Sequence, residues 1–287
     1  MTATAAQQSA NGACPGSPAG SSGRRDTPRS LSLPRRHSTA TGAMTPPLRI
    51  AMWSGPRNIS TAMMRAWENR GDCAVTDEPL YAAFLAASGI DHPGREDVIA
   101  AGETDIRKVI ASVLGAVPGG QPVWYQKHMA HHLLPETPRE WIPGLTNMLL
   151  IRDPGEVVAS YIRSRSSVTP EDIGLAQQAD LYDAIAAATG TAPPVIDAGD
   201  FLRAPEAYLR AMCAMLGIEF TPRMLAWPPG RRATDGIWAK HWYAAVEAST
   251  GFEPWRPREV KLDDPAARVV EVCLPHYLRL HAVRMVV

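Results

Sequence analysis

Several features that define common protein classes are scarce or missing in this chain of 287 residues. It has only four cysteines, Cys14, Cys73, Cys213 and Cys273, and no two of them form a CxxC pair. Cysteines this far apart predict neither a disulfide framework nor a zinc site, and they are typical of a reduced, cytoplasmic protein. No apolar run approaches the roughly 18–20 residues that a membrane-spanning helix needs.

An excess of charge of either sign is also missing. The chain has 29 Lys and Arg against 29 Asp and Glu, so its formal net charge is +0. This balance argues against a general binder of nucleic acid or of membrane surfaces. Local basic residues must therefore form any site for an anionic nucleotide. The hydrophobic content of 45% is enough to bury a core, and nothing in the sequence sets an oligomeric state.

The first 47 residues differ in composition from the rest. They contain one acidic residue, Asp26, and no aromatic residue, so they cannot bury enough apolar surface to fold. An acid-poor start rich in Arg and Ser also resembles a transit peptide, but it lacks clear amphipathic periodicity. We expect residues 1–47 to be a disordered tail, or an upstream extension of a protein that begins at Met44, and residues 48–287 to be the folded domain.

From residue 48 onward, short β-like runs alternate with helical stretches. This alternation predicts an α/β fold, in which a parallel sheet is covered by helices on both faces. The part after Pro222 is rich in Pro, Trp and Arg and predicts a long loop followed by irregular helices. The predicted strands are 48–53, 73–76, 122–126, 146–151 and 194–197, and the predicted helices are 58–69, 103–116, 154–163, 171–189 and 205–216.

Polar residues follow each predicted strand at its carboxyl end. In open parallel sheets, ligands bind beyond these ends, and all of them lie along one edge. The sequence therefore predicts a site at this edge from pattern alone. Its candidate residues are 54–61 after the first strand, Asp77 and Glu78 after the second, Lys127 and His128 after the third, Arg152 and Asp153 after the fourth, and Gly199 and Asp200 after the fifth.

The loop after the first strand reads S-G-P-R-N-I-S-T. Gly55 permits a tight turn, and Ser60 and Thr61 lie at a helix start, where free N–H groups favour a phosphate or sulfate. Arg57 adds a full positive charge. The loop lacks the Gly-Lys pair of nucleoside triphosphatases, and from local chemistry alone an ordinary turn between a strand and a helix explains it equally well.

Four segments together resemble the sulfotransferases that use PAPS, 3'-phosphoadenosine 5'-phosphosulfate. Residues 54–61 resemble the loop that binds the 5'-phosphosulfate, although Ile59 stands where the family has a glycine. Residues 151–161 are similar to the 3'-phosphate segment, in which an arginine and a serine eight residues later bind that phosphate. Residues 195–220 resemble the strand and helix that follow, and residues 230–240 resemble the C-terminal loop that closes over the 3'-phosphate.

The resemblance implies a P-loop-type fold and transfer of a sulfuryl group from PAPS, without a metal, to a hydroxyl or amine of a small-molecule or carbohydrate acceptor. Sulfuryl transfer asks the protein mainly to position the reactants and to stabilise charge. The donor-binding residues that the resemblance implies are Gly55, Pro56, Arg57, Asn58, Ile59, Ser60, Thr61, Arg152, Ser160, Arg231 and Arg232.

Two residues compete for the role of general base, which the acceptor needs. Glu78 resembles the glutamate of an E-P-L sequence in carbohydrate-type sulfotransferases, whereas His128 resembles the histidine of a K-T-H sequence in the small-molecule branch. We favour Glu78, because Lys127 and His128 are adjacent here instead of two residues apart. Lys127 is then the candidate cation for the sulfuryl group. Alternatively, Glu78 is only an acid at a helix N-terminus.

Other interpretations stay open at this point. His128, His131 and His132 have a spacing that suits a metal on a helix, but no acidic partner with ligand spacing is near, so they fit a solvated helix or an acceptor pocket better. Arg231 and Arg232 fit a surface pair equally well. Two other functions remain in competition, a P-loop kinase of a small metabolite and a non-catalytic nucleotide-binding module. Three tryptophans are either core or acceptor wall: Trp238, Trp242 and Trp255.

Overall fold

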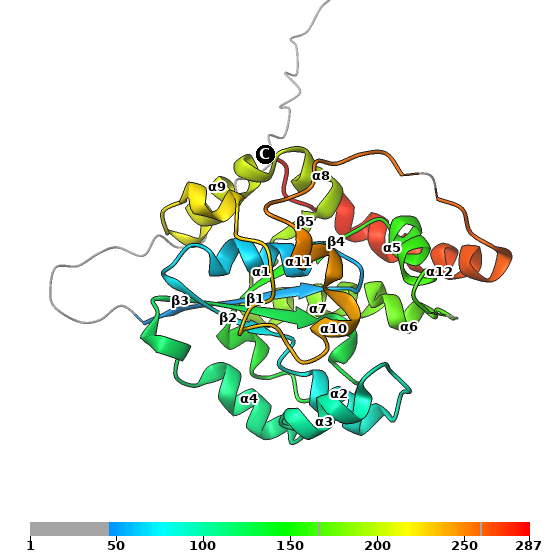
Figure 1. The fold of residues 1–287 in the computed structure, drawn as a ribbon, viewed down its shortest axis with the longest axis horizontal. Coiled ribbons are helices and arrows are strands. Elements are labelled where there is room, and N and C mark those ends of the chain that lie inside the picture. Colours follow the sequence, from blue (N-terminus) through cyan, green and yellow to red (C-terminus); the bar gives the residue numbers. More distant parts are fainter. Residues whose placement is uncertain (1–45, 166, 259) are drawn as a thin grey trace, which may run out of the picture. The chain divides into compact units, whose positions relative to one another are not determined.

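The computed structural model describes residues 46–165, 167–258 and 260–287, so residues 1–45 of the predicted tail lie outside the described residues. The described chain contains one sheet of five strands, all parallel, in the order β2-β3-β1-β4-β5 (Figure 1). The strands are β1 (Leu48–Ser54), β2 (Cys73–Asp77), β3 (Val123–Met129), β4 (Thr146–Ile151) and β5 (Val195–Asp197).

Helices cover both faces of this sheet and make the predicted three-layer α/β fold. One face packs on α1 (Ser60–Glu68), α8 (Ala198–Arg203) and α9 (Pro205–Leu216), which bury Trp67, Phe201 and Leu209. The other face packs on α4 (Ile106–Leu114), α5 (Pro154–Tyr161), α7 (Leu175–Thr189) and α12 (Asp264–Ala282). Because both faces are covered, β4 is apolar almost throughout, as expected for a buried parallel strand.

Local signals placed several element ends correctly. β4 has the predicted bounds. α5 begins at Pro154, and the carboxylate of Asp153 accepts a hydrogen bond from the Glu156 amide, as a helix N-cap does. α9 ends at Gly217, whose φ of 69° is the left-handed conformation that favours glycine.

Other elements differ from the predictions. β3 continues three residues beyond its predicted end, to Met129. The single helix predicted at 171–189 is two helices, α6 (Pro170–Ile173) and α7, because Gly174 between them has a φ of 74°. Two helices lie where no element was predicted, α2 (Tyr81–Ser88) and α3 (Arg95–Ala101).

The C-terminal part is more regular than predicted. A long segment with the short helices α10 (Ala239–Trp242) and α11 (Ala244–Ala248) follows Pro222, as expected. It leads, however, into the regular 19-residue helix α12. Pro275 lies inside this helix, and an internal proline argues against a helix in the sequence. The helix forms because a stripe of buried side chains packs it against the sheet, namely Val269, Cys273, Tyr277 and Leu280. No described helix has the length and apolar character to cross a bilayer.

Gly55 is required at the end of β1 for a reason other than a turn conformation. Its φ is not positive, but a Cβ at this position would lie 2.5 Å from the carbonyl oxygen of Ile173. Real Cβ atoms do not come this close to backbone, so the loop after β1 and the end of α6 must move apart if a side chain is added.

We therefore expect Gly55→Ala to lower the free energy of unfolding by about 1–3 kcal/mol, as overpacking does. Urea unfolding measures this change. Gly144→Ala is the matched control, because the nearest atom to its added Cβ is a side-chain carbon of Leu114 at 3.7 Å, and its effect should stay within about 0.5 kcal/mol. Equal effects of the two substitutions would contradict the steric explanation.

Candidate active site

A cavity of about 970 Å³ opens at the carboxyl edge of the sheet. Its walls include residues that follow each of the five strands, as expected for a parallel sheet: Pro56 to Ala62 after β1, Glu78 after β2, His131 and His132 after β3, Arg152 after β4, and Ala198 and Gly199 after β5. Further parts of the walls come from α2, from α5 and from the segment between Trp238 and Arg258.

At one end of the cavity, the loop after β1 is joined to α5. The Arg57 guanidinium donates a hydrogen bond from Nε to Ser160 Oγ over 3.0 Å. Arg152 Nη1 donates to the carbonyl oxygen of Arg57 over 2.8 Å, and Asn58 Nδ2 donates to the Leu150 carbonyl over 2.9 Å. The two segments that resemble the donor-binding motifs therefore meet, and Arg57, Arg152 and Ser160 line the same wall.

This end of the cavity favours an anion. Burial lowers the pKa of Arg57, and the positive charges of Arg163 and Arg152 lower it further. Among these groups, Arg152 is paired with a carboxylate, that of Glu156 at 2.7 Å. Helix α1 starts here with Ile59 as its N-cap residue, so no side chain caps its first turn, which holds no acid. Free helix N–H groups beside mutually repelling guanidiniums fit a phosphate or sulfate.

A buried ion cluster lies elsewhere in the same cavity. Asp77 of β2 and Lys127 of β3 are neighbours in the strand register, and Lys127 Nζ lies 2.9 Å from Asp77 Oδ1. The same ammonium donates to Glu78 Oε1 over 2.6 Å and to the Tyr243 hydroxyl over 2.6 Å. Burial alone would lower the pKa of Lys127, but the Asp77 and Glu78 carboxylates raise it well above its ordinary value.

Glu78 does not act as a helix-terminal acid. Helix α2 begins three residues later, and Glu78 itself has a φ of 41°, which is unusual for a residue other than glycine. Its carboxylate instead pairs with Lys127, and its second oxygen, Oε2, lies 4.0 Å from His132 Nε2. Burial raises the pKa of Glu78 despite the opposing effect of Lys127, and this direction favours proton uptake by the carboxylate.

The structure does not bring His128 to this cavity. Side chains alternate along a strand, so His128 points to the face of β3 opposite to Lys127. There it stacks on Trp53, its neighbour in the register, with 4.4 Å between ring centroids. Its Nε2 lies 3.0 Å from Gln126 Oε1, and burial lowers the pKa of His128 to about 3. The predicted strand end at residue 126 concealed this separation.

Arg231 and Arg232 also lie outside the cavity walls. Arg231 is exposed, and Arg232 donates to the Pro228 carbonyl and lies 4.0 Å from Glu68. Two arginines that were not predicted, Arg256 and Arg258, line the cavity instead. No motif marked these two residues in the sequence.

Aromatic rings and imidazoles line the cavity wall around Glu78. His132 stacks on Tyr81 and Phe84, with ring centroids 4.8 and 4.7 Å away, and Trp238 meets Tyr81 edge to face. Burial lowers the pKa of His131 to about 3 and that of His132 also falls, so both rings are neutral. The pocket interpretation of His131, His132, Trp238 and Trp242 agrees with this placement, whereas Tyr81 and Tyr243 carried no sequence signal.

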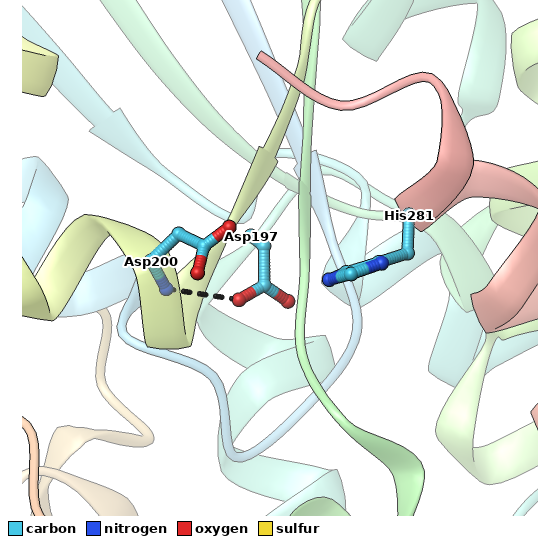
Figure 2. Close-up of side chains that lie close together, drawn as sticks. All are labelled: Asp197, Asp200 and His281. Atoms are coloured by element: carbon cyan, nitrogen blue, oxygen red, sulfur yellow. Dashed lines mark hydrogen bonds between the residues drawn. The ribbon is translucent and has the colours of Figure 1, made fainter. Parts of the chain in front are cut away.

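Within the part of the chain that the structure describes, one group of side chains has the spacing of a metal site, and it lies at the end of β5. Figure 2 shows Asp197, Asp200 and His281 close together. The Asp197 carboxylate caps α8 by accepting from the Asp200 amide, and it also accepts from the Tyr277 hydroxyl. Asp200 pairs with Arg203 and Arg284. Protein donors therefore already balance these carboxylates.

Comparison with known proteins agrees with this geometry. Residues 48–283 match the family model of the sulfotransferase domain, so the chain belongs to the sulfotransferase family. A sulfotransferase from Alicyclobacillus acidocaldarius has the same fold, with a TM-score of 0.50 and 13% identity over 84% of this chain and 98% of that one.

Two curated relatives from Arabidopsis thaliana are longer than this chain. They are branched-chain-amino-acid aminotransferase-like proteins 2 and 1, each 36% identical over 236 and 242 residues. The matches cover 81% and 83% of this chain but 41% and 43% of the relatives. The chain therefore spans about two fifths of the length of these proteins.

The buried histidine on the far face of β3 predicts a pH dependence of stability. Below pH about 6.5 the unfolded chain takes up a proton at His128, whereas the folded chain does not do so until about pH 3. Stability is therefore lost as the pH falls through this window. In His128→Gln, the slope of unfolding free energy against pH between 4.5 and 5.5 should be smaller by about 1.4 kcal/mol per pH unit. Parallel slopes for the two proteins, measured by urea unfolding, would show that His128 titrates normally.

Proposed function

We propose that the chain transfers a sulfuryl group from PAPS to a hydroxyl or amine of a small molecule. The observation that supports this most strongly is the junction of the two donor-like segments, in which Arg152 binds the Arg57 carbonyl and Arg57 binds Ser160. The eight-residue spacing of Arg152 and Ser160 resembles that of the family's 3'-phosphate segment. In the structure, both residues line the cavity together with the loop after β1. PAPS supplies an activated sulfuryl group and two anionic ends for such a wall.

In this proposal, the donor end works through charge and orientation. The N–H groups at the start of α1, with Ser60 and Thr61, hold the 5'-phosphosulfate, and Arg57 offsets the charge that develops there. Arg152 and Ser160 hold the 3'-phosphate. Arg256 and Arg258 take the closing role that the sequence assigned to Arg231 and Arg232.

The chemical step pairs this charge stabilisation with proton removal. Glu78 Oε2 takes the proton from the acceptor's oxygen or nitrogen, and the freed electron pair forms the new bond to sulfur. The bond between sulfur and the bridging oxygen breaks, and its electrons stay on the 5'-phosphate of the departing nucleotide. Lys127 stabilises the charge on the sulfuryl oxygens from the same cavity.

The wall around Glu78 favours one kind of acceptor. Tyr81, Phe84, Trp238 and Trp242 present rings to the cavity, and His131 and His132 are neutral. Both residues line the cavity as uncharged rings, so they add polar atoms to this wall without adding charge. These walls suit a small acceptor with an apolar body and a few polar groups better than an extended carbohydrate.

Rival functions explain fewer of these features. A kinase of a small metabolite needs a loop with the Gly-Lys pair that the chain lacks. A non-catalytic nucleotide-binding module has no use for the buried Glu78–Lys127 pair. The aminotransferase-like names belong to relatives of which this chain spans about two fifths, and the carboxylates around Lys127 raise its pKa, which opposes the neutral amine that an aminotransferase lysine needs.

Donor recognition is tested by calorimetry with 3'-phosphoadenosine 5'-phosphate, AMP, and ATP with magnesium. We expect clear preference for the 3'-phosphorylated nucleotide without metal. Arg152→Ala should reduce the preference for it over AMP by about 10-fold or more, because a charge-assisted contact is lost. Arg210→Ala, at an exposed ion pair on α9, should leave the preference unchanged. Tighter binding of ATP with magnesium would support the kinase instead.

The role of Glu78 is tested by Glu78→Gln, which keeps a hydrogen-bond acceptor for Lys127 but removes the base. Turnover of labelled PAPS with a panel of alcohols and amines should fall by about 10²–10⁴-fold, with nucleotide affinity unchanged. Glu206→Gln, at an exposed acid, serves as the matched control and should turn over like the wild type. A Glu78→Gln protein with full turnover would rule out Glu78 as the base.

A further inference from the structure

Tyr243 connects the C-terminal segment to the buried ion cluster. It lies between α10 and α11, is 4% exposed, and lines the cavity. Its hydroxyl donates to Asp77, with Oδ2 at 2.7 Å. The same oxygen accepts from Lys127 Nζ at 2.6 Å and from Trp238 Nε1 at 3.3 Å. One donor and two acceptor positions exhaust what a phenol hydroxyl offers, so this geometry fixes the group completely.

The ammonium of Lys127 is fully used in the same way. It has three N–H donors, and these go to Asp77, Glu78 and Tyr243. Two carboxylates thus compete for one buried cation. Two further donors fix the Asp77 carboxylate: the Tyr243 hydroxyl, and the amide of Gly236, which donates to Asp77 Oδ2 over 3.1 Å.

We infer that Tyr243 and Asp77 are positioning residues that share the Lys127 ammonium with Glu78, and that this sharing sets how readily Glu78 accepts the acceptor's proton. The catalytic part of this inference rests on the proposed function, in which Glu78 is the general base. When Glu78 takes the proton, it loses its charge and its hold on Lys127 weakens. One N–H of the ammonium is then free for the sulfuryl oxygens at the stage when charge must be stabilised.

The effect of each partner on Glu78 has a definite sign. Without the Tyr243 hydroxyl, Asp77 Oδ2 loses a donor and Lys127 loses an acceptor. The freed N–H of Lys127 then turns to Asp77, which draws the ammonium away from Glu78, so the pKa of Glu78 should rise. Without the Asp77 charge, Lys127 serves Glu78 alone and a repelling carboxylate is gone, so this pKa should fall. The other titratable groups that face Glu78 are His132 after β3 and Tyr81 on α2, and neither is changed.

The test measures the titration of Glu78 directly, by carbon NMR of protein labelled at the glutamate carboxyls, with Glu78→Gln to assign the signal. Tyr243→Phe should raise the pKa of Glu78 by about one unit, and Asp77→Asn should lower it by a similar amount. The acidic limb of kcat/KM against pH should move with each pKa, while nucleotide binding and the KM for the acceptor change little.

Tyr208→Phe is the matched control, because Tyr208 is a buried tyrosine whose hydroxyl donates to the Met285 carbonyl outside the cavity. Tyr208→Phe should leave the pKa of Glu78 unchanged. Shifts of the same sign in Tyr243→Phe and Asp77→Asn, or no shift in Tyr243→Phe, would overturn the inference. If Asp77→Asn does not fold, the shift in Tyr243→Phe decides.

The outcomes also separate the inference from the proposed function. Opposite shifts in a protein that transfers no sulfuryl group to any acceptor would support the shared ammonium and reject the sulfotransferase proposal. Normal turnover with an unchanged pKa of Glu78 in both variants would support the sulfotransferase proposal and reject the shared ammonium.

Discussion

The ammonium of Lys127 lies out of water between two carboxylates and a phenol hydroxyl, and much of the site depends on it. An isolated buried cation costs several kcal/mol, so β3 carries this lysine only because β2 ends beside it with Asp77 and Glu78. The third partner, Tyr243, comes from a segment more than a hundred residues later in the chain. The cluster therefore holds the C-terminal segment over the sheet edge as well as holding the lysine.

A second constraint acts on the backbone. Arg57 and Glu78, the two non-glycine residues with positive φ in the described chain, lie in the same cavity, one in the loop after β1 and one after β2. Such conformations persist where surrounding contacts fix them. Arg57 is held by Ser160 and by Arg152, and Glu78 is held by Lys127 at both its amide and its carboxylate. Backbone strain and side-chain charge thus coincide at both of these cavity positions.

The sequence predicted those features that depend on neighbours in the chain. The apolar run of β4, the Asp153–Pro154 start of α5 and the Gly217 end of α9 are local signals, and the gathering of strand ends at one edge follows from a parallel sheet. The faces of β3 were not predicted, because the predicted strand ended three residues too early. Lys127 and His128 were therefore placed together in a loop, whereas in the strand they project to opposite sides. Tyr243, Arg256 and Arg258 reach the cavity through tertiary packing of a segment with no periodic pattern, so no local signal could mark them.

The segment from Trp238 to Arg258 lines both parts of the cavity, with Trp238, Trp242 and Tyr243 near Glu78 and with Trp255, Arg256 and Arg258 further along. Because one uninterrupted stretch of chain forms both walls, an insertion or exchange within it changes the surroundings of Glu78 and of the guanidiniums together. For the proposed function, a change of acceptor specificity by grafting this segment therefore has to preserve the residues at both of its ends.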